Sequence, residues 1–278
     1  MDAHSITIDG SVKAKLNTIR DGMIKSISAN AISQRLKNTK YSGDPKSGVV
    51  EVSRFKNAVS KDYGTARGAS KGELLQDKKI QVVINKRKEI VEEVTKHDLA
   101  LYGVEGIVES RAENHRKVLE AELDRDFFTE AVSNAAEVVV TGAKNMGEVL
   151  ELAAQALETT KNDHVDGVER EMIKITLNPL AFGKTRNFLD TLKTVSTDNG
   201  VKEIGFFHGM QVESSTRQTA AVLAMIDGAV AQPVLIDEYK LEKIPLSNDF
   251  ALQLFYSYGE KSLTPDLTKK ITTLPEGV

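Results

Sequence analysis

The chain has 278 residues, a formal net charge of −3, 40% hydrophobic and 28% charged residues, and no cysteine. This composition is ordinary for a globular protein with room for a sizeable core, and it excludes disulfides, thiolate nucleophiles and cysteine-ligated metals. The near-neutral charge predicts no overall basic field for nucleic acid, and the sequence shows neither an apolar run of the roughly 18 residues that span a bilayer nor the pattern of a signal peptide.

Residues 11–37 have the spacing of an amphipathic helix, with apolar positions at Val12, Leu16, Ile19, Met23 and Ile27. "YSGDPKSG" (41–48) then interrupts the chain with turn-forming residues. Residues 1–48 hold eight Lys or Arg and four Asp or Glu, and we expect them to form a basic N-terminal arm. Because the arm lacks interleaved aromatics, base stacking is unsupported. A solvated helix is as good an interpretation as a contact with nucleic acid or an acidic partner.

Residues 49–55 and 79–85 are rich in β-branched side chains and predict two strands. The 23 polar residues between them are far more than a hairpin turn needs. We therefore expect an extended hairpin over 49–85 that projects from the body. Its loop contains "GASKG" (68–72), which matches the G-x-S-x-G pattern of a nucleophilic serine, but Ser70 lacks the apolar strand that such a site requires before it.

A helix is predicted over 87–103 and a much longer one over 102–132. The apolar residues of the long helix form one stripe, made of Val104, Ile107, Val108, Ala112, Val118, Leu119, Leu123, Phe127 and Ala131. A single stripe predicts that one side packs on the body while the charged side faces water or another chain. Two charged pairs on the helix are expected to interact: Glu113 with Lys117, and Glu122 with Arg125.

Residues 86–142 hold 13 acidic and eight basic side chains, so this region is acidic where the arm is basic. Complementary surfaces of this kind suit contacts between copies of a chain.

Further along, the pattern predicts a helix over 145–160, a buried strand over 171–177 and a helix over 178–192. Asn178 as N-cap and Pro179 at the first helical position favour the start of that last helix. The remainder is rich in strands, expected within 210–215, 220–229 and 249–259. In the last of these, one face holds Phe250, Leu252, Leu254, Tyr256 and Tyr258. This mixture of elements predicts an α+β fold.

Two features invite an interpretation as catalytic or ligand sites. "NPLAFGKT" (178–185) ends like a phosphate-binding loop, which would make Lys184 and Thr185 nucleotide ligands. However, Asn178 replaces the first glycine, and Pro179 lacks the N–H that such a loop directs at phosphate, so a nucleotide-binding enzyme remains a distant alternative. His115 lies on the apolar stripe, where a packed histidine is a better interpretation than a metal ligand. We predict no catalytic residue, no cofactor and no metal site.

The order of these elements resembles the major capsid proteins of tailed bacteriophages, which share the Hong Kong 97-like fold with encapsulins and herpesvirus capsids. "KEIVEEVTKHDLALYGVEGIVESRAENHRKVLEAELDRDFFTEA" resembles the segment that leads into the family's spine helix, and the hairpin resembles its E-loop. "MIKITLNPLAFGKTRNFLDTL" is similar to a strand and helix of the axial domain. "VLAMIDGAVAQPV" and "IPLSNDFALQLFYSYGEKSLTPDL" are similar to the closing strands. Together these stretches cover most of residues 49–267.

The resemblance implies an α+β, Hong Kong 97-like fold in five parts. These are an N-terminal arm (1–48), an E-loop hairpin (49–85), a peripheral domain with the spine helix (86–142), an axial domain (143–229), and a return to the peripheral domain and C-terminus (230–278). It also implies a function: a major capsid protein, not an enzyme, whose hexamers and pentamers close an icosahedral head around the phage genome. Such a protein would be assembled in the host bacterial cytoplasm and reside in the virion capsid.

The implied partners are other copies of the chain, a portal protein, packaged double-stranded DNA through non-specific contacts, and a scaffolding protein, with no membrane. Because only 48 residues precede the hairpin, we expect a separate scaffolding protein or none. An encapsulin-like compartment is the alternative function. The expected assembly contacts are Lys61, Tyr63, Arg67 and Lys71 in the hairpin loop and Glu113, Arg116 and Lys117 on the long helix. Lys61, Lys71 and Asn248 do not match, residue by residue, the lysine–asparagine crosslink of the family's founding member.

Overall fold

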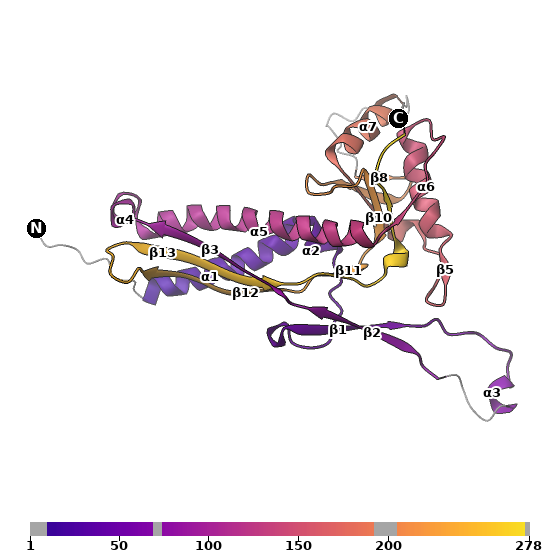
Figure 1. Cartoon of the computed structure of the whole chain (residues 1–278), viewed down its shortest axis with the longest axis horizontal. Coiled ribbons are helices and arrows are strands. Elements are labelled where there is room, and N and C mark those ends of the chain that lie inside the picture. The colour runs from indigo at the N-terminus through magenta and orange to yellow at the C-terminus, as the bar shows by residue number, and fades with distance from the viewer. Residues whose placement is uncertain (1–9, 69–73, 192–204, 276–278) are drawn as a thin grey trace, which may run out of the picture.

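The computed structural model describes residues 10–68, 74–191 and 205–275. One long helix, α5 (Val104–Asn134), extends across the molecule, with a three-stranded sheet along one side and a second body of sheet and helices at its C-terminal end (Figure 1). A two-stranded hairpin projects away from both (Figure 1). Within the described residues, every helix is too short or too polar to cross a bilayer.

The predicted first helix is divided in two. α1 (Gly10–Asn30) is followed by Ala31, whose backbone is extended, and then by α2 (Ile32–Leu36). Leu16, Met23 and Ile27 are buried as their spacing predicts, in the hydrophobic core shared with α5 and β12 (Val234–Lys243). The α1 helix of the expected arm therefore packs along the body of its own chain.

The projecting hairpin consists of β1 (Val49–Phe55) and β2 (Asp77–Val83), which pair antiparallel with Val49 opposite Val83 and Phe55 opposite Asp77. A short 3-10 helix, η1 (Pro45–Ser47), precedes it, and α3 (Thr65–Gly68) lies in its loop. The second strand lies two residues earlier than predicted. Val50, Val52 and Val82 anchor the base of the hairpin against the small strands β11 (Val230–Ala231) and β14 (Lys261–Ser262).

The predicted helix over 87–103 is wrong in its first half. Residues 86–94 form β3 (Lys86–Val94), and only α4 (Lys96–Tyr102) is helical. β3 is an outer strand of an antiparallel sheet in the order β12-β13-β3, where β13 is Phe250–Tyr258. The less exposed positions of β3 alternate, but they include Lys86 and Glu92. Because these inward positions are charged, the sequence lacks the apolar alternation that identifies a half-buried strand.

The α5 helix packs its stripe on this sheet and continues into the second body. Its buried residues are Val108, Ala112, His115, Leu119, Leu123, Phe127, Phe128 and Ala131. The predicted stripe, with His115 on it, is buried or partly buried except for Val118, which is 47% exposed, and Phe128 is buried in addition. With 31 residues, the helix is about 46 Å long at 1.5 Å per residue.

The second body is a six-stranded sheet in the order β4-β15-β10-β7-β9-β8. Its strands are β4 (Ala136–Glu137), β7 (Ile173–Leu177), β8 (Phe206–Phe207), β9 (Met210–Ser214), β10 (Val222–Ile226) and β15 (Thr268–Ile271). The helices α6 (Met146–Glu158) and α7 (Pro179–Thr191) contribute to the same hydrophobic core. Smaller elements are β5 (Lys161–Asn162), β6 (Val165–Asp166), η2 (Arg170–Met172) and η3 (Pro265–Leu267).

Besides β3 and the two-residue strands, β12 and β15 were not predicted. In β12 the pairing with β13 shifts between Ile236 and Glu238, and this irregularity interrupts the alternation of side chains. β15 has only four residues, two of which are lysines, so it carries little strand signal.

Candidate functional site

The loop of the projecting hairpin exposes large apolar side chains. Tyr63 is 92% exposed, Leu74 86% and Leu75 79%. Lys61 is exposed beside Tyr63, and Arg67 lies in α3. Two residues singled out from the sequence, Ser70 and Lys71, lie outside the described residues. Monomeric proteins seldom expose several large apolar side chains together. This hairpin loop is therefore a candidate contact surface.

The outer face of α5 carries the second group of predicted contacts. The Lys117 Nζ lies 2.8 Å from the Glu113 Oε1, and both side chains are more than 60% exposed, so this predicted pair is confirmed on the surface. Arg116 instead turns toward its own chain: its Nη1 donates to the Ser26 Oγ of α1 at 2.9 Å and to the Glu120 Oε1 at 2.8 Å. Arg116 therefore connects α5 to α1. From the sequence, Arg116 was predicted only as a contact with other subunits, and this connection was not predicted.

The complementary charges of the arm and the long helix meet within the chain. The Lys15 Nζ lies 2.8 Å from the Glu105 Oε2 and 2.9 Å from the Glu109 Oε1. These hydrogen bonds raise the pKa of Lys15 above its ordinary value. Part of the charge complementarity expected between copies is thus satisfied intramolecularly.

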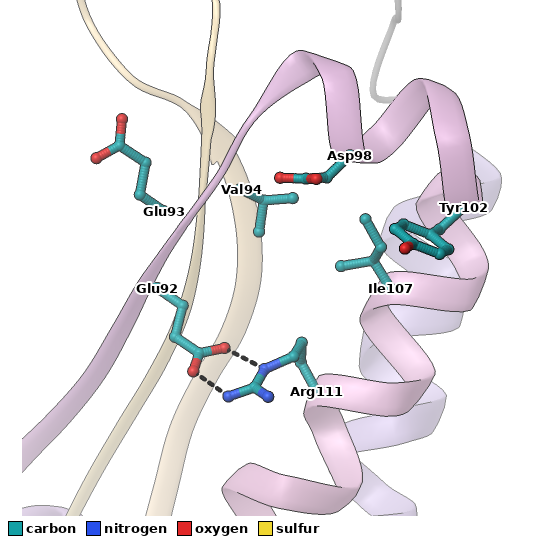
Figure 2. A pocket seen from close by; sticks show the side chains of 7 residues that line it. All are labelled: Glu92, Glu93, Val94, Asp98, Tyr102, Ile107 and Arg111. Carbon is teal, nitrogen blue, oxygen red and sulfur yellow. Dashed lines mark hydrogen bonds and ion pairs between the residues drawn. The ribbon is translucent and has the colours of Figure 1, made fainter.

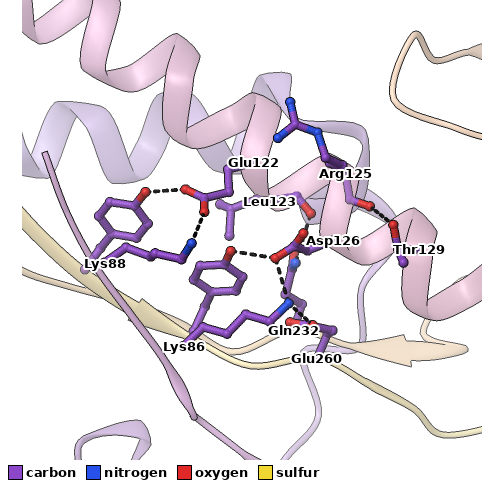
Figure 3. Close-up of polar contacts among 11 residues, drawn as sticks. Lys86, Lys88, Glu122, Leu123, Arg125, Asp126, Thr129, Gln232 and Glu260 are labelled. Carbon is purple, nitrogen blue, oxygen red and sulfur yellow. Dashed lines mark hydrogen bonds and ion pairs between the residues drawn. The ribbon is translucent and has the colours of Figure 1, made fainter.

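A row of charged residues fastens the inner face of α5 to the sheet (Figure 3). The Lys86 Nζ of β3 lies 2.7 Å from the Asp126 Oδ2 and also contacts Glu260. Two residues further along β3, the Lys88 Nζ lies 3.0 Å from the Glu122 Oε1. Two tyrosines of β13 complete the row, because Tyr258 donates to the Asp126 Oδ2 at 2.7 Å and Tyr256 donates to Glu122. The predicted Glu122–Arg125 pair is therefore wrong: Glu122 faces the sheet.

These contacts favour the charged form of the carboxylates. Burial alone would raise the pKa of Asp126, but the hydrogen bonds from Lys86 and Tyr258 outweigh it, and its pKa lies below the ordinary value. The same balance of burial against contacts with Tyr256 and Lys88 lowers the pKa of Glu122. Burial raises the pKa of both tyrosines, so they remain neutral hydrogen-bond donors.

A groove of about 490 Å³ lies between β3, α4 and the start of α5 (Figure 2). The Glu92 carboxylate faces the Arg111 guanidinium, whose Nε lies 2.6 Å from the Oε2. The fully buried His115 also contacts Glu92: its Nε2 lies 2.9 Å from the same Oε2, and its Nδ1 lies 3.4 Å from the Tyr239 hydroxyl. The hydrogen bond from Arg111 lowers the pKa of Glu92, while burial lowers the pKa of His115.

The groove is therefore held together by its own polar groups. The prediction that His115 is a packed residue is confirmed. Among the described residues, no group of three or more His, Asp or Glu side chains is close enough to hold a metal.

The "NPLAFGKT" stretch is a helix start. The Asn178 Oδ1 accepts a hydrogen bond from the Ala181 N–H at 2.8 Å, as an N-cap does. Thr185 is fully buried and donates to the Ala181 carbonyl at 2.8 Å. Because Gly183, Lys184 and Thr185 all lie inside α7, the backbone N–H groups that would cradle a phosphate are not arranged in a loop.

The sequence did not identify the lysines of β3 and their carboxylate partners, because its pattern predicts a helix over 87–103. The available signal was the run "KRK" (86–88) preceding a helix whose inner face carries acidic residues. Ion pairs of α5 connect it to α1 and β3 of the same chain. The arrangement suits rigid attachment of a long helix and contacts with other proteins rather than acid–base chemistry.

Among the comparisons with known proteins, the one with solved structures identifies the fold. No protein-family model and no curated protein matches the sequence. Among solved structures, a chain of Mycobacterium phage Che8 is similar at 17% identity and a TM-score of 0.60, over 87% of this chain and 91% of that one. The capsid structure of the cyanophage P-SCSP1u gives 12% identity and a TM-score of 0.63, over 86% of each chain. The virus-like particle from Pyrococcus furiosus gives 13% identity and a TM-score of 0.58, over 92% of this chain and 99% of that one.

The chain therefore has the mixed α+β fold of capsid-forming proteins over most of its length. At these identities the likeness defines the fold alone.

Proposed function

We propose that the protein is the major capsid protein of a tailed bacteriophage. One observation carries the proposal: the fold is similar to a chain of Mycobacterium phage Che8 and to the capsid structure of the cyanophage P-SCSP1u over more than four-fifths of this chain. The exposed apolar loop of the hairpin supports the proposal. In a single subunit, Tyr63, Leu74 and Leu75 are exposed to water, and apolar groups exposed together are typical of a surface that binds another protein.

In this proposal the five parts expected from the sequence keep their roles. The β1–β2 hairpin is the E-loop, α5 is the spine helix of the peripheral domain, and the six-stranded sheet with α6 and α7 is the axial domain. Hexamers and pentamers of the chain form an icosahedral head in the host bacterial cytoplasm and remain in the virion. Partners are a portal, a separate scaffolding protein and double-stranded DNA bound without sequence preference. Lys61, Tyr63, Arg67, Lys71, Glu113, Arg116 and Lys117 contribute to subunit contacts, with Arg116 also bound to α1.

An encapsulin-like compartment is the second candidate. It is favoured by the similarity to the virus-like particle from Pyrococcus furiosus, which extends over 92% of this chain. A nucleotide-binding enzyme has no such support, because its key residues lie inside α7.

Cryo-electron microscopy of the chain, expressed alone and together with the scaffolding and portal genes of its neighbourhood, tests the proposal. We expect closed shells built of hexamers and pentamers, and the chain as the main protein of purified virions. Shells of uniform size formed by the chain alone, with a cargo enzyme gene beside it, would favour the compartment. A chain that stays monomeric under all these conditions and is absent from particles would contradict both.

A further inference from the structure

Beyond its apolar base, the projecting hairpin is held by a second set of contacts that are polar. The apolar anchor of β1 ends at Val52. Two residues further out, the Arg54 guanidinium meets the Asp266 carboxylate of η3 in a bidentate pair, with Nη1–Oδ1 and Nη2–Oδ2 distances of 2.7 and 2.6 Å. The side chains are only 17% and 25% exposed. Two parallel charge-assisted hydrogen bonds at a partly buried site hold more firmly than a surface ion pair.

The next residues of the hairpin contact the small β5–β6 turn. The His164 Nδ1 donates to the Phe55 carbonyl at 2.9 Å, and the Asn57 N–H donates to the Asp163 carbonyl at 2.9 Å. The Lys56 Nζ lies 3.1 Å from the Asp163 Oδ2. We name these contacts of residues 54–57 with Asp163, His164 and Asp266 the latch.

The receiving side of the latch is rigid. The Asn162 side chain accepts from the N–H groups of His164 and Val165 at 2.8 and 3.0 Å, which shapes the turn, and it donates to the Asp266 Oδ2 at 2.7 Å. Gly167 closes the turn at φ +85°, with the Glu158 carbonyl 2.7 Å from the place where a Cβ would lie. A larger residue cannot occupy that position without moving the backbone. The turn is therefore preformed to receive the hairpin.

We propose that the latch is a positioning device, which fixes in the single subunit the direction in which the hairpin presents its exposed loop to a partner. A two-stranded hairpin is marginally stable by itself, and the residues beyond 57 lie outside the apolar base. Prior fixing of a binding element lowers the ordering cost that association must overcome. That the partner is a second copy of the chain rests on the proposed function; the positioning itself does not.

The latch can open without unfolding the body, since its contacts are polar and partly exposed while the base is apolar. Burial would raise the pKa of Asp266, but the hydrogen bonds from Arg54 and Asn162 outweigh it and keep its pKa below the ordinary value. The pair is therefore charged at neutral pH.

Hydrogen exchange on unassembled, full-length subunits tests the latch. We expect Asp266→Asn and Arg54→Gln to accelerate exchange of the Asn57 amide by about tenfold or more, while the amides of β1 at the base stay protected, because only a local opening has become easier. Asp166→Asn is the matched control: it lies on the same turn, and its exposed pair with Lys161 does not touch the hairpin. The exchanged pair, Arg54→Asp with Asp266→Arg, is expected to restore slow exchange. Unchanged exchange at Asn57 in both single variants would overturn the proposal.

A distance measurement gives a second readout. The chain has no cysteine, so spin labels attach only to introduced ones, at Ser60→Cys on the hairpin and Lys144→Cys on the body. The distance distribution is expected to broaden in Asp266→Asn and to remain as in the wild type in Asp166→Asn; an unbroadened distribution in Asp266→Asn would count against the latch. Both measurements use free subunits, so their failure leaves the capsid proposal standing, and a failure to form shells leaves the latch result valid.

Discussion

The two main bodies of this chain are each stabilised internally by a different kind of contact. The core between α6, α7 and the six-stranded sheet is apolar, and Val149, Leu150 and Ile173 in it are fully buried. The interface between α5 and β3 also has an apolar stripe, but Lys86, Lys88, Glu122 and Asp126 run beside it in paired rows. Buried apolar side chains contribute most of the free energy of unfolding. Partly exposed ion pairs contribute less, and their contribution depends on pH.

The difference predicts where the chain tolerates substitution. The largest effect is expected for Leu150→Ala in the apolar core, which removes a fully buried side chain. Such truncations cost about 2–5 kcal/mol in the free energy of unfolding. Denaturant unfolding of the subunit measures it. Leu101→Ala, at a 64% exposed position of α4, is the control and is expected to change stability by less than about 0.5 kcal/mol. Equal losses in the two variants would contradict the assigned core.

A smaller loss is expected for Asp126→Asn. The variant keeps the shape of the side chain but removes the charge that pairs with Lys86 and accepts from Tyr258. Lys86 keeps its contact with Glu260, and an amide oxygen still accepts from Tyr258, so only the charge-assisted part of these contacts is lost. We expect a loss of about 1–3 kcal/mol in the free energy of unfolding, measured by the same experiment. Asp21→Asn, an exposed carboxylate of α1, serves as the control without a sheet partner.

The pH dependence of this difference follows from the sign of the shift. Because the pKa of Asp126 is lower in the folded than in the unfolded chain, its contribution is fully present above the unfolded value of about 3.9 and disappears as the pH falls through the folded value. The wild type should therefore lose its advantage over Asp126→Asn in acid. An advantage that grows below pH 4 would contradict the ion-pair assignment.

The smallest effect on stability is expected on the outer face of α5. Glu113→Gln breaks an exposed pair with Lys117, and exposed pairs contribute little. The unfolding midpoint should match the wild type within error, while the yield of shells falls if this face lies between subunits. Shell yield equal to that of the wild type, measured by sedimentation, would remove Glu113 and Lys117 from the assembly contacts.

Prediction from the sequence succeeded for elements in which apolar residues recur with a single period and all face the core. The stripe of α5 and the inward face of β13 were both predicted, because apolar residues recur there at the helical and strand periods. It failed at β3, where the inward positions are charged, and at β12, where an irregularity breaks the alternation. The exposed hairpin loop was expected from its length and polarity, whereas its latch was not, since Arg54 and Asp266 lie 212 positions apart.

The sequence by itself determined the class of fold, the length and buried side of the long helix, and the existence of a projecting hairpin, since these depend on local periodicity and on turn-forming residues. Only the tertiary structure decided which charges pair, that Lys86–Val94 is a strand, and where the hairpin is held. The physical reason is that an ion pair or an outer strand is stabilised by a partner that is distant in the chain. A local sequence pattern does not identify that partner.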